Sequence, residues 1–392
     1  MVTLETADNA LKTVYLGVLE NQLNVNVNPL FSKIKKSTSN IAGKEIVKMA
    51  PYGINGGIGA GTETGALPTP TGNQYVKYVT TLKNLYGTIE ISDKAMRVSQ
   101  SSAGAFVNLL NDEMESLIKS SAFNLSRMLY GDGKGVLCNV VSASTSSNAI
   151  TLDSVKNIME GMCVQAIDVT SAPTVKDGVY KIVGIDRVNK IAYLNTNFAY
   201  NVSGANSYAL CVQNSYGLEL TGLGAIFDKN AETLYGVSKA NNFWMNPYIN
   251  EGVTEINDAT IQTAIDYIEE TSGSEIDFIA CSSAVRRAYQ QYLITYKRNI
   301  DVLNLEGGFK AISYNGIPVI ADRFVADDTM YLLNTKDFEL HQLCDWQWLE
   351  GNDGKIIKQK EGYPTYTATL VKYADLICDK PNGQAKLSGI TA

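Results

Sequence analysis

Residues 83–132 read KNLYGTIEISDKAMRVSQSSAGAFVNLLNDEMESLIKSSAFNLSRMLYGD. In the first ten residues, Leu85, Ile89 and Ile91 fall on one side of an extended chain, and mostly polar residues fall on the other. This period of two is typical of a strand with one buried face. From residue 103 to 130 the apolar residues recur at helical spacing instead. The stretch therefore predicts a strand followed by one long helix.

The length of this helix sets it apart. At about 1.5 Å of rise per residue it would be roughly 40 Å long. Ser101 or Ser102 can cap its start, and Gly131 lies where a left-handed residue commonly ends a helix. We expect the helix to cross a whole domain or to support a larger assembly.

Composition limits the classes of function. A chain of 392 residues exceeds what one core usually serves, so two or three domains are expected. The net charge is −7 and the pI is about 5.0, which is unfavourable for direct nucleic-acid binding through phosphate contacts. An acidic protein is still able to enclose nucleic acid without attracting it.

The first residues predict an arm. Residues 1–22 have the apolar stripe of a short amphipathic helix, and the segment after them is polar and extended. Such an arm gains order by lying on another domain or subunit. The start has no signal-peptide pattern, and no run of about 18 apolar residues predicts a membrane span.

Two strand-like runs, 44–52 and 75–82, enclose the segment INGGIGAGTETGALPTPTGNQ. A long loop with so few apolar residues is either a flexible linker or a functional arm, and we favour an arm that becomes ordered across a neighbouring subunit. The glycines do not have the spacing of a dinucleotide-binding or phosphate-binding loop.

The later sequence predicts two further units. Residues 135–222 contain short β-branched and aromatic runs separated by turns, which indicates an inserted small sandwich or barrel. Helices starting near Asp258 and near Ser282 or Ser283 alternate with short apolar strands, which indicates an α/β unit. The strand 363–378 is expected to pair with the early part of the fold.

No catalytic, cofactor-binding or metal-binding residue is predicted, and we expect no enzyme activity. His341 is the single histidine, and its alternating apolar neighbours indicate a strand residue with a structural role rather than a catalytic base. Asp322 is expected to serve as a structural hydrogen-bonding residue. The cysteines form no C-x-x-C pair and predict free thiols rather than a zinc site: Cys138, Cys163, Cys211, Cys281, Cys344 and Cys378.

Taken in order, these parts and the Gly-Ile-Pro-Val run at 316–319 resemble the major capsid proteins of tailed bacteriophages (Caudoviricetes), with their HK97-like fold. The resemblance implies an α+β fold and covers most of the chain, except residues 135–222, which look like a family-variable insertion of a β-rich domain. The domains would be an N-terminal arm (1–43), an extended two-stranded loop (44–91), a peripheral domain with the spine helix (92–134, completed by 346–392), the inserted β-rich domain (135–222) and an axial α/β domain (223–345).

The resemblance implies a structural protein that self-assembles into pentamers and hexamers of an icosahedral head around double-stranded DNA, without sequence-specific binding. Scaffolding and portal proteins are implied partners, and a decoration protein is a further option. The implied location is the virion, assembled in the cytoplasm of the bacterial host. The short arm implies a separate scaffold, unless processing has removed a fused one. The loop tip has no lysine, so the covalent cross-link of some relatives is not expected.

Three other classes remain open at this stage. An encapsulin-like compartment has the same fold and encloses cargo enzymes, and a phage tail or adhesin protein would account for the β-rich middle. An unrecognised hydrolase is the enzyme alternative, and the lack of plausible catalytic bases disfavours it. The predicted intersubunit contacts are charged residues: Glu63, Lys83, Arg97, Arg286, Arg287 and Arg298. For Arg286, Arg287 and Arg298, a solvated helix face is the simpler interpretation.

Overall fold

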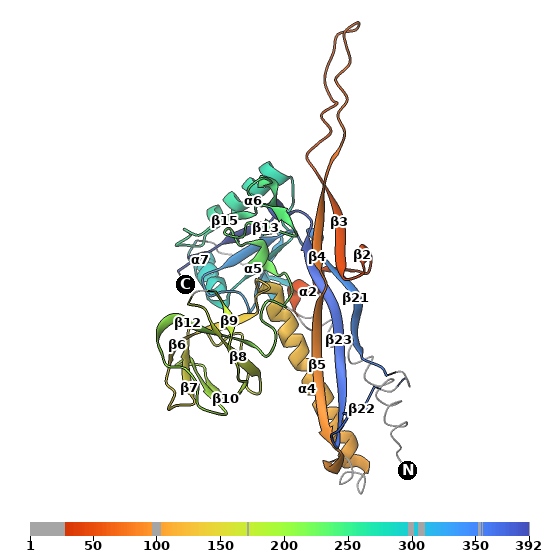
Figure 1. Cartoon of the computed structure of the whole chain (residues 1–392). Helices are drawn as coiled ribbons and strands as arrows, with labels where there is room; N and C mark the ends of the chain where they lie inside the picture. The colour runs from red at the N-terminus through yellow and green to blue at the C-terminus, as the bar shows by residue number, and fades with distance from the viewer. Residues whose placement is uncertain are drawn as a thin grey trace.

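The computed structural model shows an elongated α+β molecule from which a long hairpin projects (Figure 1). A small β-unit lies at one side, and the longest strands run beside the longest helix. The structure describes residues 28–95, 103–170, 172–296, 302–304, 310–351, 354 and 356–391. The predicted helix at 1–22 and the predicted caps Ser101 and Ser102 lie outside these residues.

A five-stranded sheet forms the long axis of the molecule. Its strands are β1 (Lys35–Ser37), β5 (Lys83–Ser92), β21 (Phe338–Trp348), β22 (Lys358–Gln359) and β23 (Thr365–Cys378). In β5, Leu85 and Ile89 are buried and Tyr86 is exposed, as the alternation predicts. Strand β5 pairs antiparallel with β23 along its whole length. The predicted return of the C-terminal strand onto the early part of the fold is confirmed.

Helix α4 (Ala103–Tyr130) has the bounds that the sequence predicts. Its inward face is apolar where it meets the sheet: Met114, Ile118, Leu125 and Leu129 are buried. Gly87 of β5 permits the close approach of the helix, since a Cβ there would lie 2.8 Å from Cδ1 of Leu117. The helix thus packs closely against the long sheet.

The end of α4 differs from the prediction. Gly131 does not have a positive φ; its amide donates to the carbonyl of Met128 (3.0 Å), and the left-handed residue is Gly133 (φ 81°). A Cβ on Gly222 would lie only 2.2 Å from the Met128 carbonyl oxygen. The helix end therefore meets a neighbouring backbone, and this contact takes the place of the predicted left-handed cap.

The β-unit is a closed barrel. Its strands are β6 (Val136–Ala143), β7 (Ala149–Leu152), β8 (Cys163–Asp168), β9 (Thr174–Val175), β10 (Tyr180–Asp186), β11 (Ile191–Leu194) and β12 (Val202–Val212). Their order is β10-β11-β7-β6-β12-β8-β9, and β10 also pairs with β8, which closes the ring. The interior is filled by its own apolar cluster, including Val140, Ile150, Val164, Ile182 and Leu210. Of the two predicted architectures, the barrel is present.

A second seven-stranded sheet builds the α/β unit, in the order β15-β24-β20-β16-β19-β18-β17. The strands are β15 (Tyr248–Asn250), β16 (Phe278–Cys281), β17 (Val302–Asn304), β18 (Lys310–Tyr314), β19 (Ile317–Ala321), β20 (Met330–Leu333) and β24 (Ala385–Leu387). Ile279 and Cys281 share a core with helices α6 (Asp258–Ser272) and α7 (Ser283–Tyr296), whereas Phe278 and Ala280 face the main core. The sheet is thus buried on both faces.

Caps define both helices of this unit. Asn257 accepts from the amide of Thr260 at the start of α6, and Gly273 (φ 64°) ends the helix in a left-handed conformation. The Ser282 hydroxyl accepts from the amide of Val285 at the start of α7 (3.0 Å). The remaining short elements are α2 (Pro29–Lys33), β2 (Ile41–Ala42), α5 (Leu223–Ile226), β13 (Thr233–Leu234), β14 (Val237–Ser238), η1 (Phe243–Met245), η2 (Thr335–Asp337) and η3 (Pro381–Gly383).

Candidate functional site: the extended hairpin and its anchorage

The projecting hairpin consists of β3 (Glu45–Tyr52) and β4 (Gln74–Thr81). The two strands pair antiparallel without a register shift, from Glu45 opposite Thr81 to Tyr52 opposite Gln74. Beyond this last pair, residues 53–73 form no strand and extend away from the rest of the molecule (Figure 1). The base of the hairpin is regular, and its tip is not.

The tip exposes apolar side chains that its own subunit leaves uncovered. Ile54 is 82% exposed, Ile58 74% and Leu67 90%. Glu63, also exposed, is the single charged residue between 53 and 73. Apolar surface in water is unfavourable, so an ordered role for this tip requires a surface on another molecule.

Tyr78 anchors the hairpin base in the main core. Its side chain is fully buried, and its hydroxyl lies 3.2 Å from Sδ of Met245 and 3.3 Å from the carbonyl oxygen of Asp379. The ring stacks near Trp244, which also stacks on Tyr52 with ring centroids 5.2 Å apart. Burial raises the pKa of Tyr78, so its hydroxyl stays protonated. The base is therefore part of the core.

Lys48 adds an ionic anchor. Its ammonium group lies 2.6 Å from Oε2 of Glu339 and 2.7 Å from Oδ2 of Asp379. Burial alone would lower the pKa of Lys48, but the hydrogen bonds to Asp379 and Glu339 outweigh burial and raise it. These contacts tie β3 to the start of β21 and to the residue that follows β23.

Asp375 holds the other hairpin strand. This fully buried residue of β23 accepts from the Thr80 hydroxyl (2.6 Å), from the amide of Thr221 (2.8 Å) and from the amide of Leu376 (3.0 Å). Burial raises the pKa of Asp375, and these donors together with the charge of Lys83 oppose that shift. One carboxylate thus joins the hairpin, the long sheet and the chain that leaves the barrel.

A second buried carboxylate joins three other parts of the chain. Asp322 accepts from the side-chain amide of Asn28, from the hydroxyl of Tyr130 and from the amide of Phe324 (3.0 Å). Burial raises the pKa of Asp322 despite these donors. The predicted structural role of Asp322 is confirmed, and its contacts meet where α2, α4 and the α/β unit converge.

Near the end of α4, Arg127 and Glu219 form a buried ion pair. The guanidinium donates to both carboxylate oxygens, at 2.8 and 2.5 Å, and the side chains are 4% and 2% exposed. This bidentate geometry is the strong form of an arginine–carboxylate contact. It fixes the long helix to the segment that returns from the barrel.

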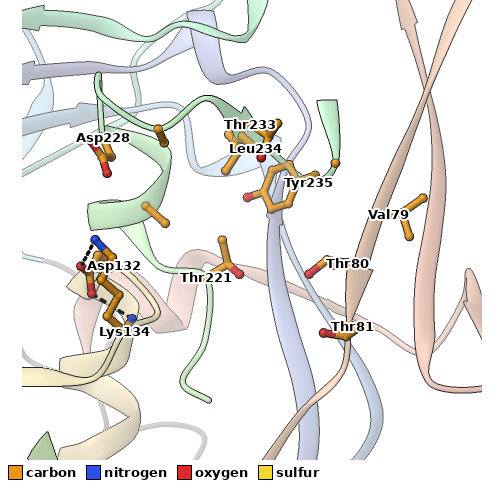
Figure 2. Close-up of a pocket in the computed structure, with 13 residues that line it drawn as sticks. Val79, Thr80, Thr81, Asp132, Lys134, Thr221, Asp228, Thr233, Leu234 and Tyr235 are labelled. Carbon is orange, nitrogen blue, oxygen red and sulfur yellow. Dashed lines mark hydrogen bonds and ion pairs between the residues drawn. The ribbon is translucent and has the colours of Figure 1, made fainter. Parts of the chain in front are cut away.

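A cleft of about 430 Å³ opens beside the hairpin base (Figure 2). Its walls include Thr80 and Thr81 of β4 on one side and Asp132 and Lys134 on the other, where the aspartate and the lysine interact with each other. Apolar side chains and a further carboxylate, that of Asp228, also line the cleft. These groups provide neither a nucleophile with a base nor a set of three metal ligands. The cleft is a gap of mixed polarity between hairpin and body.

The other side chains that could serve as a catalytic base or nucleophile are buried or have partners within the chain. His341 is fully buried in β21, with Nδ1 3.1 Å from the Ser39 carbonyl oxygen and Nε2 3.3 Å from a carboxylate oxygen of Glu339. Burial raises the pKa of Cys211 to about 11 and that of Cys281 to about 12, so neither thiol is primed as a nucleophile. Among the described residues, no group of three or more potential ligands has metal-site geometry, and no helix is long and apolar enough to span a membrane.

The predicted contact residues are dispersed. Glu63 lies at the hairpin tip, and Lys83 is half-buried at the start of β5, opposite Ala374. Arg286 and Arg287 lie in the first turns of α7, the former half-buried and the latter exposed. The positive charge of Lys83 acts on Asp375 within its own chain.

Arg97 and Arg298 lie outside the described residues. The predicted contact residues that are described do not converge on one site. They mark separate places on an extended surface.

Sequence reasoning missed the anchors Lys48, Tyr78 and Asp375. A signal was present, since Lys372 and Asp375 interrupt the otherwise apolar and aromatic second half of this strand, residues 370–378. Charges in such a strand require buried partners. Lys372 is indeed fully buried and donates to Asp345 (2.6 Å).

This arrangement defines a class of protein: an elongated α+β subunit in which a long helix and sheet carry a hairpin beyond the subunit's own core. No protein-family profile and no curated protein matches the sequence. Solved structures do match. A chain of the cyanophage A-1(L) capsid asymmetric unit aligns with a TM-score of 0.54 and 13% identity, over 95% of this chain and 92% of that one.

Two further matches have lower TM-scores. The capsid of Myoviridae phage XM1 gives 0.43 at 10% identity, over 93% of this chain and 92% of that chain. The SrpI encapsulin complex of Synechococcus elongatus gives a TM-score of 0.48 at 7% identity, over 93% of this chain and 89% of that chain. The chain has the HK97-like fold found in tailed-phage major capsid proteins, and this prediction is confirmed.

Proposed function

We propose that this chain is the major capsid protein of a tailed bacteriophage, a structural, non-enzymatic subunit. Copies of the chain would form the pentamers and hexamers of an icosahedral head that encloses double-stranded DNA. The fold supports a shell role, and the acidic net charge of −7 fits a wall that encloses DNA without binding it by sequence.

One observation carries the proposal: the hairpin is fixed at its base and uncovered at its tip. Tyr78 and Lys48 hold the base in the core, whereas Ile54 and Leu67 are exposed at the tip. A neighbouring copy would cover these apolar side chains. Many such modest contacts, repeated around a closed shell, add up to a stable assembly.

The finer features follow from this role. We propose the domain division given above, with the barrel (135–222) as an insertion between the spine helix and the axial unit. Glu63 and Lys83 would form charge pairs with neighbouring copies, as would Arg97, Arg286, Arg287 and Arg298. Scaffolding and portal proteins would be partners during assembly in the host cytoplasm, and a decoration protein is a further candidate.

Electron microscopy of the chain, expressed alone and with its neighbouring genes, tests the shell. Closed icosahedral particles are expected, and dispersed monomers in both cases would contradict the proposal. Nuclease treatment of particles produced during infection or induction tests the contents. Protected double-stranded DNA is expected, whereas particles that hold protein cargo and no DNA would indicate a compartment instead.

A further inference from the structure

A second cavity, of about 310 Å³, lies where the barrel meets the α/β unit. The barrel contributes Lys156, from the segment after β7, and Arg187, from the turn between β10 and β11. The α/β unit contributes Arg287 of α7 and Arg323 of the loop after β19. Four cationic side chains from distant parts of the sequence thus line one cavity.

Two of these cations are neutralised within the chain. Lys156 donates to Oδ1 of Asp327 (2.5 Å), and Arg187 forms a bidentate pair with Glu160 at 2.7 and 3.0 Å. The remaining acidic residue in the lining, Asp322, is buried and is occupied by the donors described above. Neither Arg287 nor Arg323 forms an ion pair with these acids, although the negative charge of Asp322 acts on its neighbour Arg323.

Arg287 and Arg323 have no carboxylate within ion-pair distance among the residues that the structure describes. Arg323 donates to the Lys156 carbonyl oxygen (3.0 Å), and its guanidinium lies over the rings of Phe123 and Phe324. Burial and the positive charge of Arg187 lower the pKa of Arg323, and the negative charge of Asp322 opposes that shift. Among the described residues, the cavity therefore holds two guanidinium groups without an ion-pair partner, and that of Arg323 is held in place by packing.

We propose that this cavity binds a small oxyanion of the phosphate class. Arg287 and Arg323 would donate charge-assisted hydrogen bonds to its oxygens, and guanidinium groups suit tetrahedral oxyanions because they present several N–H donors in a fixed fork. The cavity exceeds the volume of one phosphate, so water fills the remainder. Because the lining comes from both units, the bound anion would fasten the barrel to the α/β unit.

The proposal is tested by titrating the full chain with inorganic phosphate at constant ionic strength. Isothermal calorimetry measures binding, and thermal unfolding measures the change in stability. Phosphate is expected to bind and to raise the unfolding temperature above that in sodium chloride. Arg287→Gln removes one guanidinium donor from an exposed position, and we expect phosphate to bind about tenfold more weakly. The matched control is Arg286→Gln, one residue earlier on α7 and outside the cavity lining, which should bind like the wild type.

Amide hydrogen exchange gives an independent readout. Phosphate should slow exchange in residues 153–161 and 186–190, the barrel segments at the cavity. Three results would overturn the proposal: no difference between phosphate and chloride, equal loss of binding in both arginine variants, or equal stabilisation by malonate, which would contradict the phosphate class. None of these results depends on shell assembly, so they leave the proposed function untouched.

Discussion

At the scale of single residues, buried charges define the places where distant parts of the chain join. Arg127 and Glu219 illustrate this, since both are almost fully buried and bond bidentately. Replacing one partner leaves the other charge buried and unpaired. We expect Glu219→Gln to lower the free energy of unfolding by about 3–5 kcal/mol, measured by chemical denaturation of the unassembled chain.

The exposed pair Arg187–Glu160 is the matched control. It has the same bidentate geometry, but its side chains are 52% and 43% exposed. Solvent screens such a pair, so Glu160→Gln should cost about 1 kcal/mol or less. Equal effects of the two substitutions would contradict the importance of burial at Arg127.

The raised pKa of Asp337 makes the free energy of unfolding depend on pH. Burial raises its pKa from 3.8 to about 6, assisted by the negative charge of Asp379 and opposed by Lys380. Between these two pKa values the folded chain retains a proton that the unfolded chain has released. This group therefore makes the free energy of unfolding fall as pH rises through that window.

Asp337→Asn removes this titration and keeps an amide oxygen able to accept from Gln384, which now lies 3.0 Å from the carboxylate. Relative to the wild type, the variant should be more stable at about pH 7.5 than at about pH 4. Denaturation curves of both proteins at the two pH values measure the difference. A difference that does not change with pH would contradict the raised pKa.

At the scale of elements, the end of the long helix depends on a close backbone contact. A Cβ on Gly222 would lie 2.2 Å from the carbonyl oxygen of Met128, and backbone cannot move aside as a flexible side chain can. We expect Gly222→Ala to destabilise the chain by about 1–3 kcal/mol or more, measured by thermal or chemical unfolding.

Gly72, in the hairpin tip, provides the control for Gly222. Nothing lies within 4 Å of a Cβ built there, and its φ is not positive. Gly72→Ala should change the free energy of unfolding by no more than about 0.5 kcal/mol. A Gly222 variant as stable as the Gly72 variant would show that the helix end tolerates a shift.

Elements with local periodicity were predictable from the sequence. The alternation in β5, the bounds of α4 and the start of α6 all appear as expected, because each depends on residues close in sequence. The closure of the barrel by β8 and β10 was not predictable, because the choice of strand partners depends on the three-dimensional fold and not on the local sequence pattern. Gly131 was predicted wrongly for the same reason: the segment at Gly222, distant in sequence, determines how the helix ends.

At the scale of the whole molecule, we propose that the hairpin tip contributes to contacts between subunits and not to the stability of its own subunit. Tyr52 and Gln74 are already paired across the hairpin, so an Asn-Gly turn can replace residues 53–73. We expect this variant to retain the wild-type unfolding free energy within about 1 kcal/mol. It should fail to form closed particles, as measured by denaturation and by light scattering.

The control for this variant is Glu63→Gln, which removes the single charge of the tip and keeps its apolar side chains. If apolar burial dominates the contact, the Glu63→Gln variant should still assemble. Its particles should lose at most some of their heat stability. A tip-deleted chain that forms shells of normal heat stability would show that the hairpin is dispensable.

A cryo-electron microscopy reconstruction of particles assembled from the wild-type chain tests the central claim most directly. The claim is that the hairpin is fixed to its own subunit at Tyr78 and Lys48 and is completed by another copy at its tip. The account predicts a closed icosahedral shell in which Ile54, Ile58 and Leu67 lie against a neighbouring subunit. A shell in which these side chains face solvent, or a chain that forms no shell, would contradict it.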